Sequence, residues 1–229
     1  MLKIYGVPIS VHTRKVIVTA IEKELAFEVE PVIPFNPPAG WEKLSPTGKI
    51  PVCTDGDRVL CDSSVICTYL ERVHPAHRIY PEDTETLVQA LWFEEYADGT
   101  IFREVVHGLF FQKVIRPNIL KQQTDAASVD GILNGALPKV FGYLEGSIGG
   151  DHLAGGRFGI ADIATVSNLI NFHYLGFTLD PRRFPRLNAY FARQLRQPSI
   201  VAALRAEQPV AAAMGLSSGF VRELSPAAA

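Results

Sequence analysis

The hydrophobic pattern of this chain changes near residue 75, and the change limits the folds that the chain can adopt. Before that point, short runs of alternating apolar residues, typical of strands, are interleaved with segments of helical periodicity. After it, no strand pattern occurs and the apolar residues recur at helical spacing. We therefore predict a small α/β domain over residues 1–75, a linker over 76–83, an all-helical domain over 84–213 and a tail over 214–229.

The composition is that of an ordinary globular protein. Of the 229 residues, 47% are hydrophobic and 20% are charged, and the formal net charge is −2. This balance gives no electrostatic reason to expect binding to nucleic acid or to an anionic membrane. No run approaches the ~18 apolar residues of a membrane-spanning helix, and charged residues near the N-terminus argue against a secretory signal. We expect a cytoplasmic protein.

The cysteine and histidine spacings do not suggest a metal site. Cys53, Cys61 and Cys67 form no C-x-x-C pair, which argues against a dithiol redox centre and a zinc ribbon. We expect them to be reduced and packed as small apolar residues. His74 and His77 have no third ligand nearby in the sequence, so we expect no bound metal.

The segment 2–21 predicts a strand, a turn and a helix with a hydroxyl group at the turn. A short alternating run is ended by glycine and proline, and a helical apolar stripe follows the polar residues around Ser10. A helix N-terminus presents unpaired N–H groups and about half a positive charge, so it stabilises an anion. Ser10 could donate a hydrogen bond to that anion. Alternatively, Ser10 caps the helix, or Thr13 caps it and leaves Ser10 free.

Two further positions in the first domain could bind a ligand. A strand over 50–53 begins at Pro51, and a cis bond there would turn the backbone of Ile50 outward to pair with an extended peptide-like ligand. By frequency a trans bond is expected, since only about 5–6% of such bonds are cis. Asp62 and Ser63 begin a third helix, where they could cap it or help its N–H groups to bind a carboxylate.

The second domain is predicted to contain five helices and no strand. We expect the first to be long, with a possible bend at Gly99 or Gly108. The tail from Met214 lacks periodicity, so we expect it to be mobile or loosely attached. The five predicted helices cover residues 84–115, 126–144, 160–174, 183–195 and 199–207.

In their order and spacing, these motifs resemble those of the serine-type cytosolic glutathione transferases. The serine-type members include the theta and phi classes and many bacterial relatives. The motifs are Ser10 at a strand-to-helix turn, the sequence GKIP ending at Pro51, and Asp62-Ser63 at a helix start, followed by a helical domain. The resemblance implies an N-terminal thioredoxin-like domain, with a four-stranded mixed sheet and helices, and a C-terminal helical bundle. It extends to about residue 208.

The resemblance also assigns a role to each motif residue. It implies that Ser10 donates a hydrogen bond to the glutathione sulfur, that Pro51 is the family's cis-proline, and that the backbone of Ile50 pairs with the cysteinyl part of glutathione. Asp62 and Ser63 would receive the γ-glutamyl end. It further implies that Lys49 reaches the backbone or the glycyl carboxylate, and that Asp98, or alternatively Glu94 or Glu95, contacts the γ-glutamyl amine across a homodimer.

The chain departs from the family pattern in two places. The loop that carries basic residues for the glycyl carboxylate in phi-like relatives is Asn36-Pro37-Pro38 here. The family's helical domain usually has a capping box, with Ser or Thr at the N-cap and Asp three residues later. This chain keeps the aspartate, Asp162, but has Gly159 at the N-cap. We interpret Asp162 as a folding residue.

Some residues carry a weaker expectation. His107, Phe110 and Phe111 lie on the helix that we expect to border the second-substrate pocket, although aromatic residues at helical spacing are usually core. Tyr5 could line the site or pack in the core, and His12 could face the thiolate or be exposed.

The predicted function is conjugation of glutathione, as a co-substrate, to a small apolar electrophile. The same thiolate would also serve a glutathione-dependent peroxidase, dehalogenase, isomerase or ether-cleaving enzyme. A non-catalytic scaffold or regulatory protein is a further alternative, but such relatives tend to lose the residue at the Ser10 position, which this chain keeps. A glutaredoxin-like dithiol reductase is disfavoured because no cysteine lies in the turn.

Overall fold

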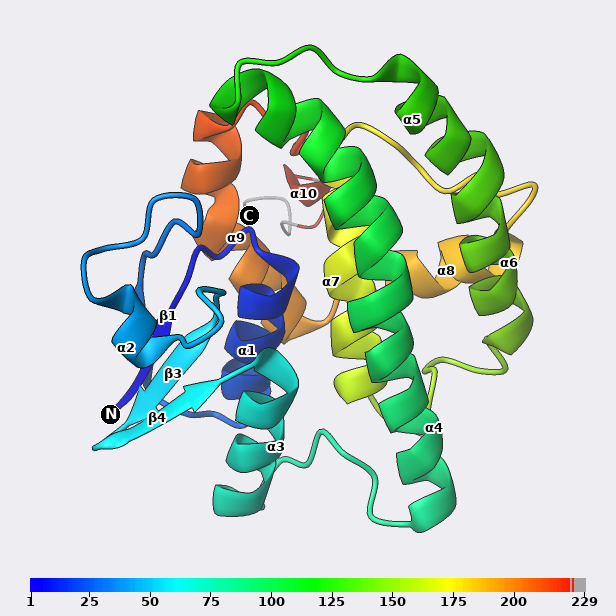
Figure 1. The fold of residues 1–229 in the computed structure, drawn as a ribbon. Coiled ribbons are helices and arrows are strands. Elements are labelled where there is room, and N and C mark those ends of the chain that lie inside the picture. The colour runs from blue at the N-terminus through cyan, green and yellow to red at the C-terminus, as the bar shows by residue number, and fades with distance from the viewer. Residues whose placement is uncertain (223, 225–229) are drawn as a thin grey trace, which may run out of the picture.

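The computed structural model describes residues 1–222 and 224 and has two domains side by side (Figure 1). The first domain contains a four-stranded sheet in the order β2-β1-β3-β4. Strand β1 is parallel to β2 and antiparallel to β3, which forms a hairpin with β4. The predicted mixed sheet is thus confirmed. Its strands are β1 (Leu2–Tyr5), β2 (Phe27–Glu30), β3 (Val52–Asp55) and β4 (Arg58–Cys61).

The strand register brings three predicted motifs to one end of the sheet. Tyr5, the last residue of β1, pairs with Val52, the first residue of β3, and Val52 pairs with Cys61, the last residue of β4. The chain continues from β1 toward Ser10, enters β3 from Pro51 and continues from β4 into Asp62. All three segments therefore meet the sheet at the same end. This convergence follows from the pairing and needs no contact between the three segments themselves.

Helices α1 (Val11–Glu22), α2 (Trp41–Leu44) and α3 (Ser63–Val73) complete the first domain. Helix α1 packs against α3 and also against α7 and α9 of the second domain, so it is buried from several sides. Its residues are accordingly buried from Thr13 to Ala20, including charged ones.

The second domain is helical throughout its described residues. The long helix predicted from residue 84 is present but is not a regular α-helix after Glu95. Tyr96–Ile101 and Arg103–Ile119 form wider turns of the π type, which include Gly99, Gly108 and Pro117. The elements are α4 (Thr84–Glu95), η1 (Tyr96–Ile101), η2 (Arg103–Ile119), α5 (Ala126–Gly131), η3 (Ile132–Ala136), α6 (Leu137–Ser147), α7 (Ile160–Tyr174), α8 (Pro185–Gln194), α9 (Pro198–Ala213) and α10 (Gly219–Arg222).

The buried residues of this long helix form a row along it. Ala97, Ile101, Val105 and Leu109 are fully buried and recur every four residues, and the next buried position, after Phe110, is Val114. An α-helix of 3.6 residues per turn would carry such a row gradually off the buried face. Both η1 and η2 pack against α7.

Gly159 at the start of α7 has a structural reason that the sequence did not show. A Cβ atom added to Gly159 would lie 2.7 Å from the backbone oxygen of Ile79 in the linker. That oxygen accepts a hydrogen bond from the N–H of Ile160 at 2.9 Å, so a backbone carbonyl partners the first N–H group of the helix. Asp162 accepts hydrogen bonds from the N–H groups of Gly159 and Leu153, which is the folding role that we predicted.

The described part of the tail is attached to the helical domain, contrary to our expectation. The N–H of Ser217 donates to the carbonyl of Tyr174 at 2.9 Å. Val221 is 7% exposed, and the Phe220 ring lies 5.2 Å from the Tyr174 ring. Apolar contacts and backbone hydrogen bonds therefore hold this segment against the helical domain. The rest of the predicted tail, residues 223 and 225–229, lies outside the described residues.

Candidate functional site

Ser10 lies at the N-terminus of α1, in the turn that the sequence predicted. Its N–H donates to the carbonyl of Val7 at 3.0 Å, and its backbone is extended, with φ −68° and ψ 130°. Its Oγ accepts a long hydrogen bond, 3.5 Å, from the N–H of Thr13, so Ser10 rather than Thr13 caps the helix. Capping uses a lone pair of the hydroxyl group. The O–H is therefore still available to donate to an anion, and the two interpretations are compatible.

The second motif lies beside this turn. The Ile50–Pro51 peptide bond is cis, as the resemblance implied and against the frequency of cis bonds in general. Lys49 before it is exposed, and its carbonyl accepts a hydrogen bond from Ser45 Oγ at 2.7 Å. Contact of the Lys49 side chain with a ligand stays a prediction.

Asp62 and Ser63 begin α3 as predicted. Asp62 has a positive φ of 74°, and its Oδ1 accepts hydrogen bonds from the N–H groups of Ser64 and Val65 at 2.9 and 3.3 Å. The Oγ of Ser63 lies 3.4 Å from Nδ1 of His12, in the first turn of α1. This contact joins the N-termini of α1 and α3, so both helix ends face the same region.

Asp98 belongs to a buried ionic network within its own chain. Lys15 contacts it and also donates to Glu94 Oε1 at 3.0 Å and to Ser64 Oγ at 2.9 Å. Burial alone would lower the pKa of Lys15, but the negative charges of Asp98 and Glu94 outweigh burial and raise it. Burial alone would raise the pKa of Asp98, but a hydrogen bond from His12 and the charge of Lys15 lower it to about 2. Contact with glutathione across a dimer stays a prediction.

The residues predicted for the second-substrate pocket differ in their surroundings. His107 and Phe111 are exposed on η2, but Phe110 is 7% exposed and packs with Val114 and Ile115 in a small core cluster. The pKa of His107 is lowered by burial and by the nearby positive charge of Lys49. Their role in lining a pocket stays a prediction, and the side chain of Phe110 is largely buried.

Phe102 is an aromatic residue near the site that the sequence analysis did not single out. Its ring centroid is 4.5 Å from that of His12 and 4.5 Å from that of His107. The three rings form a row from the first turn of α1 to η2. Helical spacing from His107 could have suggested Phe102, but the contact with His12 depends on how the two domains pack.

A second buried network involves Arg14, which the sequence analysis also missed. The Arg14 guanidinium donates to both carboxylate oxygens of Glu207, at 2.9 and 3.0 Å, and to Oδ1 of Asn171 at 2.9 Å. Arg14 is fully buried, and Glu207 lies 193 residues away in the chain. A charged residue on a short helix normally suggests a solvated face, so no sequence signal pointed to this pair.

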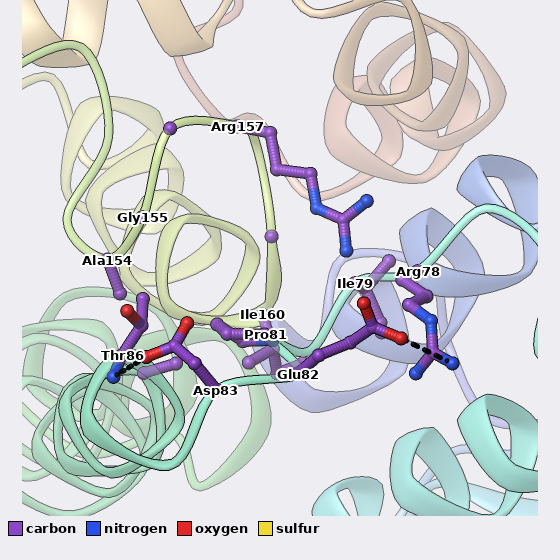
Figure 2. A pocket seen from close by; sticks show the side chains of 13 residues that line it. Arg78, Ile79, Pro81, Glu82, Asp83, Thr86, Ala154, Gly155, Arg157 and Ile160 are labelled. Atoms are coloured by element: carbon purple, nitrogen blue, oxygen red, sulfur yellow. Dashed lines mark hydrogen bonds and ion pairs between the residues drawn. The ribbon is translucent and has the colours of Figure 1, made fainter.

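Two grooves in the structure lie away from Ser10. One, of about 640 Å³, lies between the linker and the loop before α7, with Arg157 on one side and the ion pair of Arg78 with Glu82 on the other (Figure 2). The other, of about 610 Å³, lies beside β1 and has Tyr5 and Trp41 among its lining residues, so Tyr5 borders a groove outside the candidate site.

Three observations concern metals, thiols and membranes. Within residues 1–222 and 224, no group of three or more His, Cys, Asp or Glu side chains could hold a metal ion. Burial raises the pKa of the Cys53 and Cys67 thiols to about 12, so neither is an activated nucleophile. No helix in the described part of the chain has the length and apolar character needed to span a membrane.

Comparison with known proteins gives the family. Residues 4–78 match the family "Glutathione S-transferase, N-terminal domain", and residues 122–193 match "Glutathione S-transferase, C-terminal domain". The chain is 31% identical to glutathione S-transferase 3 of Zea mays, over 70% of this chain and 73% of the relative. It is 29% identical to glutathione S-transferase PARB of Nicotiana tabacum, over 89% and 97% of the two chains.

A solved structure described as FzlA from C. crescentus has the same fold. Its TM-score is 0.86 at 22% identity, covering 98% of this chain and 99% of that one. The fold and the two matched domains agree with the strand order and the helical second domain described above. This chain therefore belongs to the glutathione S-transferase family.

Proposed function

We propose that this protein is a glutathione transferase in which Ser10 stabilises the thiolate of bound glutathione for attack on a small apolar electrophile. The observation that supports the proposal is the convergence of three predicted motifs at one end of the sheet. These motifs are the Ser10 hydroxyl at the α1 N-terminus, the Ile50–Pro51 backbone beside β3, and Asp62–Ser63 at the α3 N-terminus.

The free energy required for this chemistry is within reach of the groups present. A thiol with a pKa of ~8.5 is mostly protonated at neutral pH, and lowering that pKa by about two units requires roughly 2.7 kcal/mol. A hydrogen bond to a charged acceptor contributes about 1.5–3 kcal/mol, and a helix N-terminus adds about 0.3–1 kcal/mol. Ser10 at the first turn of α1 combines both contributions. The nucleophile is the glutathione sulfur, and Ser10 only donates a hydrogen bond to it.

The two ends of the tripeptide bind to groups of opposite charge. Ser63 and the N–H groups at the start of α3 receive the γ-glutamyl carboxylate. Lys15 carries one positive charge against the two negative charges of Glu94 and Asp98, so an excess negative charge lies near Ser64, and it attracts the γ-glutamyl amine. Lys49, exposed at the other side, attracts the glycyl carboxylate.

The protein acts as a homodimer that buries one face of α4. Val88, Leu91 and Trp92 recur at helical spacing on this helix, and their exposed fractions are 61%, 41% and 51%. A contiguous exposed apolar stripe of this kind is typical of an interaction surface. Sedimentation velocity of the protein and of Leu91→Glu tests this proposal: a monomer in both samples would exclude the dimer.

The role of Ser10 is tested by titrating the thiol of bound glutathione through its ultraviolet thiolate absorbance. The Ser10→Ala variant is expected to raise the pKa of that thiol by about one to two units, because it removes a hydrogen bond to the charged sulfur. Ser63→Ala is the matched control, since it should weaken the binding of S-methylglutathione and leave the thiol pKa unchanged. Equal pKa values in the parent protein and Ser10→Ala would remove Ser10 from the mechanism.

Activity assays then separate the reaction types that share a thiolate. A chlorodinitrobenzene-type substrate reports conjugation, and a hydroperoxide reports glutathione-dependent reduction. We expect conjugation to exceed reduction. Binding of glutathione without turnover of either substrate class would favour the non-catalytic alternative.

A further inference from the structure

The peptide carbonyl immediately before Ser10 is held by the helical domain. The carbonyl oxygen of Ile9 accepts a hydrogen bond from Nδ2 of Asn171 at 3.2 Å and a longer one from Nη2 of Arg14 at 3.4 Å. Asn171 lies on α7 and is 2% exposed, and Ile9 is 5% exposed. The N–H of the same peptide group, which belongs to Ser10, donates a hydrogen bond to the carbonyl of Val7. The peptide group before Ser10 therefore has hydrogen-bond partners in both domains.

The orientation of the Asn171 amide follows from its neighbours. A guanidinium only donates hydrogen bonds, so the Asn171 oxygen must be the atom that faces Arg14, at 2.9 Å. The NH₂ group then points to the Ile9 carbonyl. Arg14 is itself held by the carboxylate of Glu207 and by the carbonyl of Ser167 at 2.7 Å. These partners are buried, so water does not compete for the hydrogen bonds.

We propose that Asn171 is a positioning residue for Ser10, acting through the Ile9 carbonyl to hold the Ser10 hydroxyl where it meets the glutathione sulfur. The inference rests on the proposed function of Ser10. A hydrogen bond weakens steeply as its geometry departs from linear, and a site residue that is not held by its surroundings loses much of its effect. Asn171 thus links ionisation of the thiol in the first domain to the packing of α7 in the second.

The test replaces Asn171 with aspartate, which keeps the shape and an acceptor for Arg14 but has no donor for the Ile9 carbonyl. The thiolate fraction of bound glutathione near neutral pH is expected to fall about threefold to tenfold, because one hydrogen bond that orients the turn is lost. Binding of S-methylglutathione, measured by calorimetry, is expected to stay unchanged, since this ligand has no thiol to ionise. Asn171→Ala removes the same donor without adding a charge and serves if the aspartate variant does not fold.

The matched control is Asn168→Asp, one turn earlier on α7. Asn168 is also buried, but its Nδ2 donates to the carbonyls of Ala97 and Ala164, away from the Ser10 turn. This variant is expected to lower the thermal stability and leave the thiol pKa unchanged. A pKa shift as large as that of Asn171→Asp would mean general loosening of the domain and would overturn the inference.

A double variant separates this inference from the proposed function. If Asn171 acts through Ser10, Asn171→Asp changes nothing further in a Ser10→Ala background. A raised thiol pKa in Ser10→Ala with an unchanged pKa in Asn171→Asp overturns only the positioning role. An unchanged pKa in Ser10→Ala overturns both.

Discussion

Arg14 and Lys15 are neighbouring cations on α1, and both are buried against the helical domain, yet their surroundings differ. Arg14 and Glu207 form a neutral pair whose side chains are 0% and 1% exposed. Lys15 has two carboxylate partners, and one of them, Asp98, is 16% exposed. The Arg14 network adjoins the Ser10 turn through Ile9, and the Lys15 network adjoins the start of α3 through Ser64.

The chemistry of the two cations fits these different tasks. The planar guanidinium of Arg14 donates to a carboxylate, an amide and a backbone carbonyl at once, which fixes three segments relative to one another. The ammonium of Lys15 has three N–H donors, which match its three partners Ser64, Glu94 and Asp98. The first network is closed and balanced, and the second has an excess negative charge at its exposed edge. The comparison suggests that one network orients the group at the sulfur while the other attracts the γ-glutamyl amine.

The largest expected effect tests the closed network. Glu207→Gln should lower the free energy of unfolding by about 3–5 kcal/mol, because it leaves the buried Arg14 charge without a counter-ion. Glu94→Gln is the matched control and should cost clearly less, since Asp98 still neutralises Lys15. Urea unfolding at pH 7 measures both variants. Equal losses of unfolding free energy in the two variants would contradict the proposed difference between the Arg14 and Lys15 networks.

An intermediate effect is expected from Asp98, and it depends on pH. Its pKa in the folded protein is about 2, below the ordinary value of 3.8, so its charged form stabilises the fold at neutral pH. That contribution, on the order of 2 kcal/mol, is present above about pH 4 and is lost as the pH falls toward 2. The difference in unfolding free energy between the parent protein and Asp98→Asn should therefore narrow on acidification. A constant difference between pH 6 and pH 2.5 would contradict it.

The smallest expected effect concerns Ser64, the neutral partner of Lys15. Ser64→Ala should lower the free energy of unfolding by about 1 kcal/mol, the usual net contribution of a hydrogen bond. It should also weaken S-methylglutathione binding slightly, because Asp98 loses a contact on the side of α3. Thermal unfolding and calorimetry report the two effects. A shift in the pKa of the bound thiol would instead show that Ser64 influences the sulfur. It would contradict the separate roles given to the Arg14 and Lys15 networks.

Much of the fold could be predicted because local sequence patterns determine where strands, turns and helices form. Alternation, turn residues and helical spacing predicted the strands of the first domain, the Ser10 turn and the helical second domain, and each is present; the mixed sheet was implied by the family resemblance. The π-type turns were not predicted. The packing of the tail was also missed, since a few apolar residues can hold a segment that has no periodicity in its sequence.

The sequence alone determined which chemical groups stand at the helix N-termini, because caps, turns and strand ends are set by residues close together in the chain. Only the tertiary structure decided which charged residues meet in the interior. Charged residues on a helix are usually solvated, but α7, α9 and α4 cover Arg14 and Lys15 and supply Asn171, Glu207 and Glu94 as their partners. The physical reason is that a buried charge requires a partner in space, and chain order does not reveal a partner far away in the sequence.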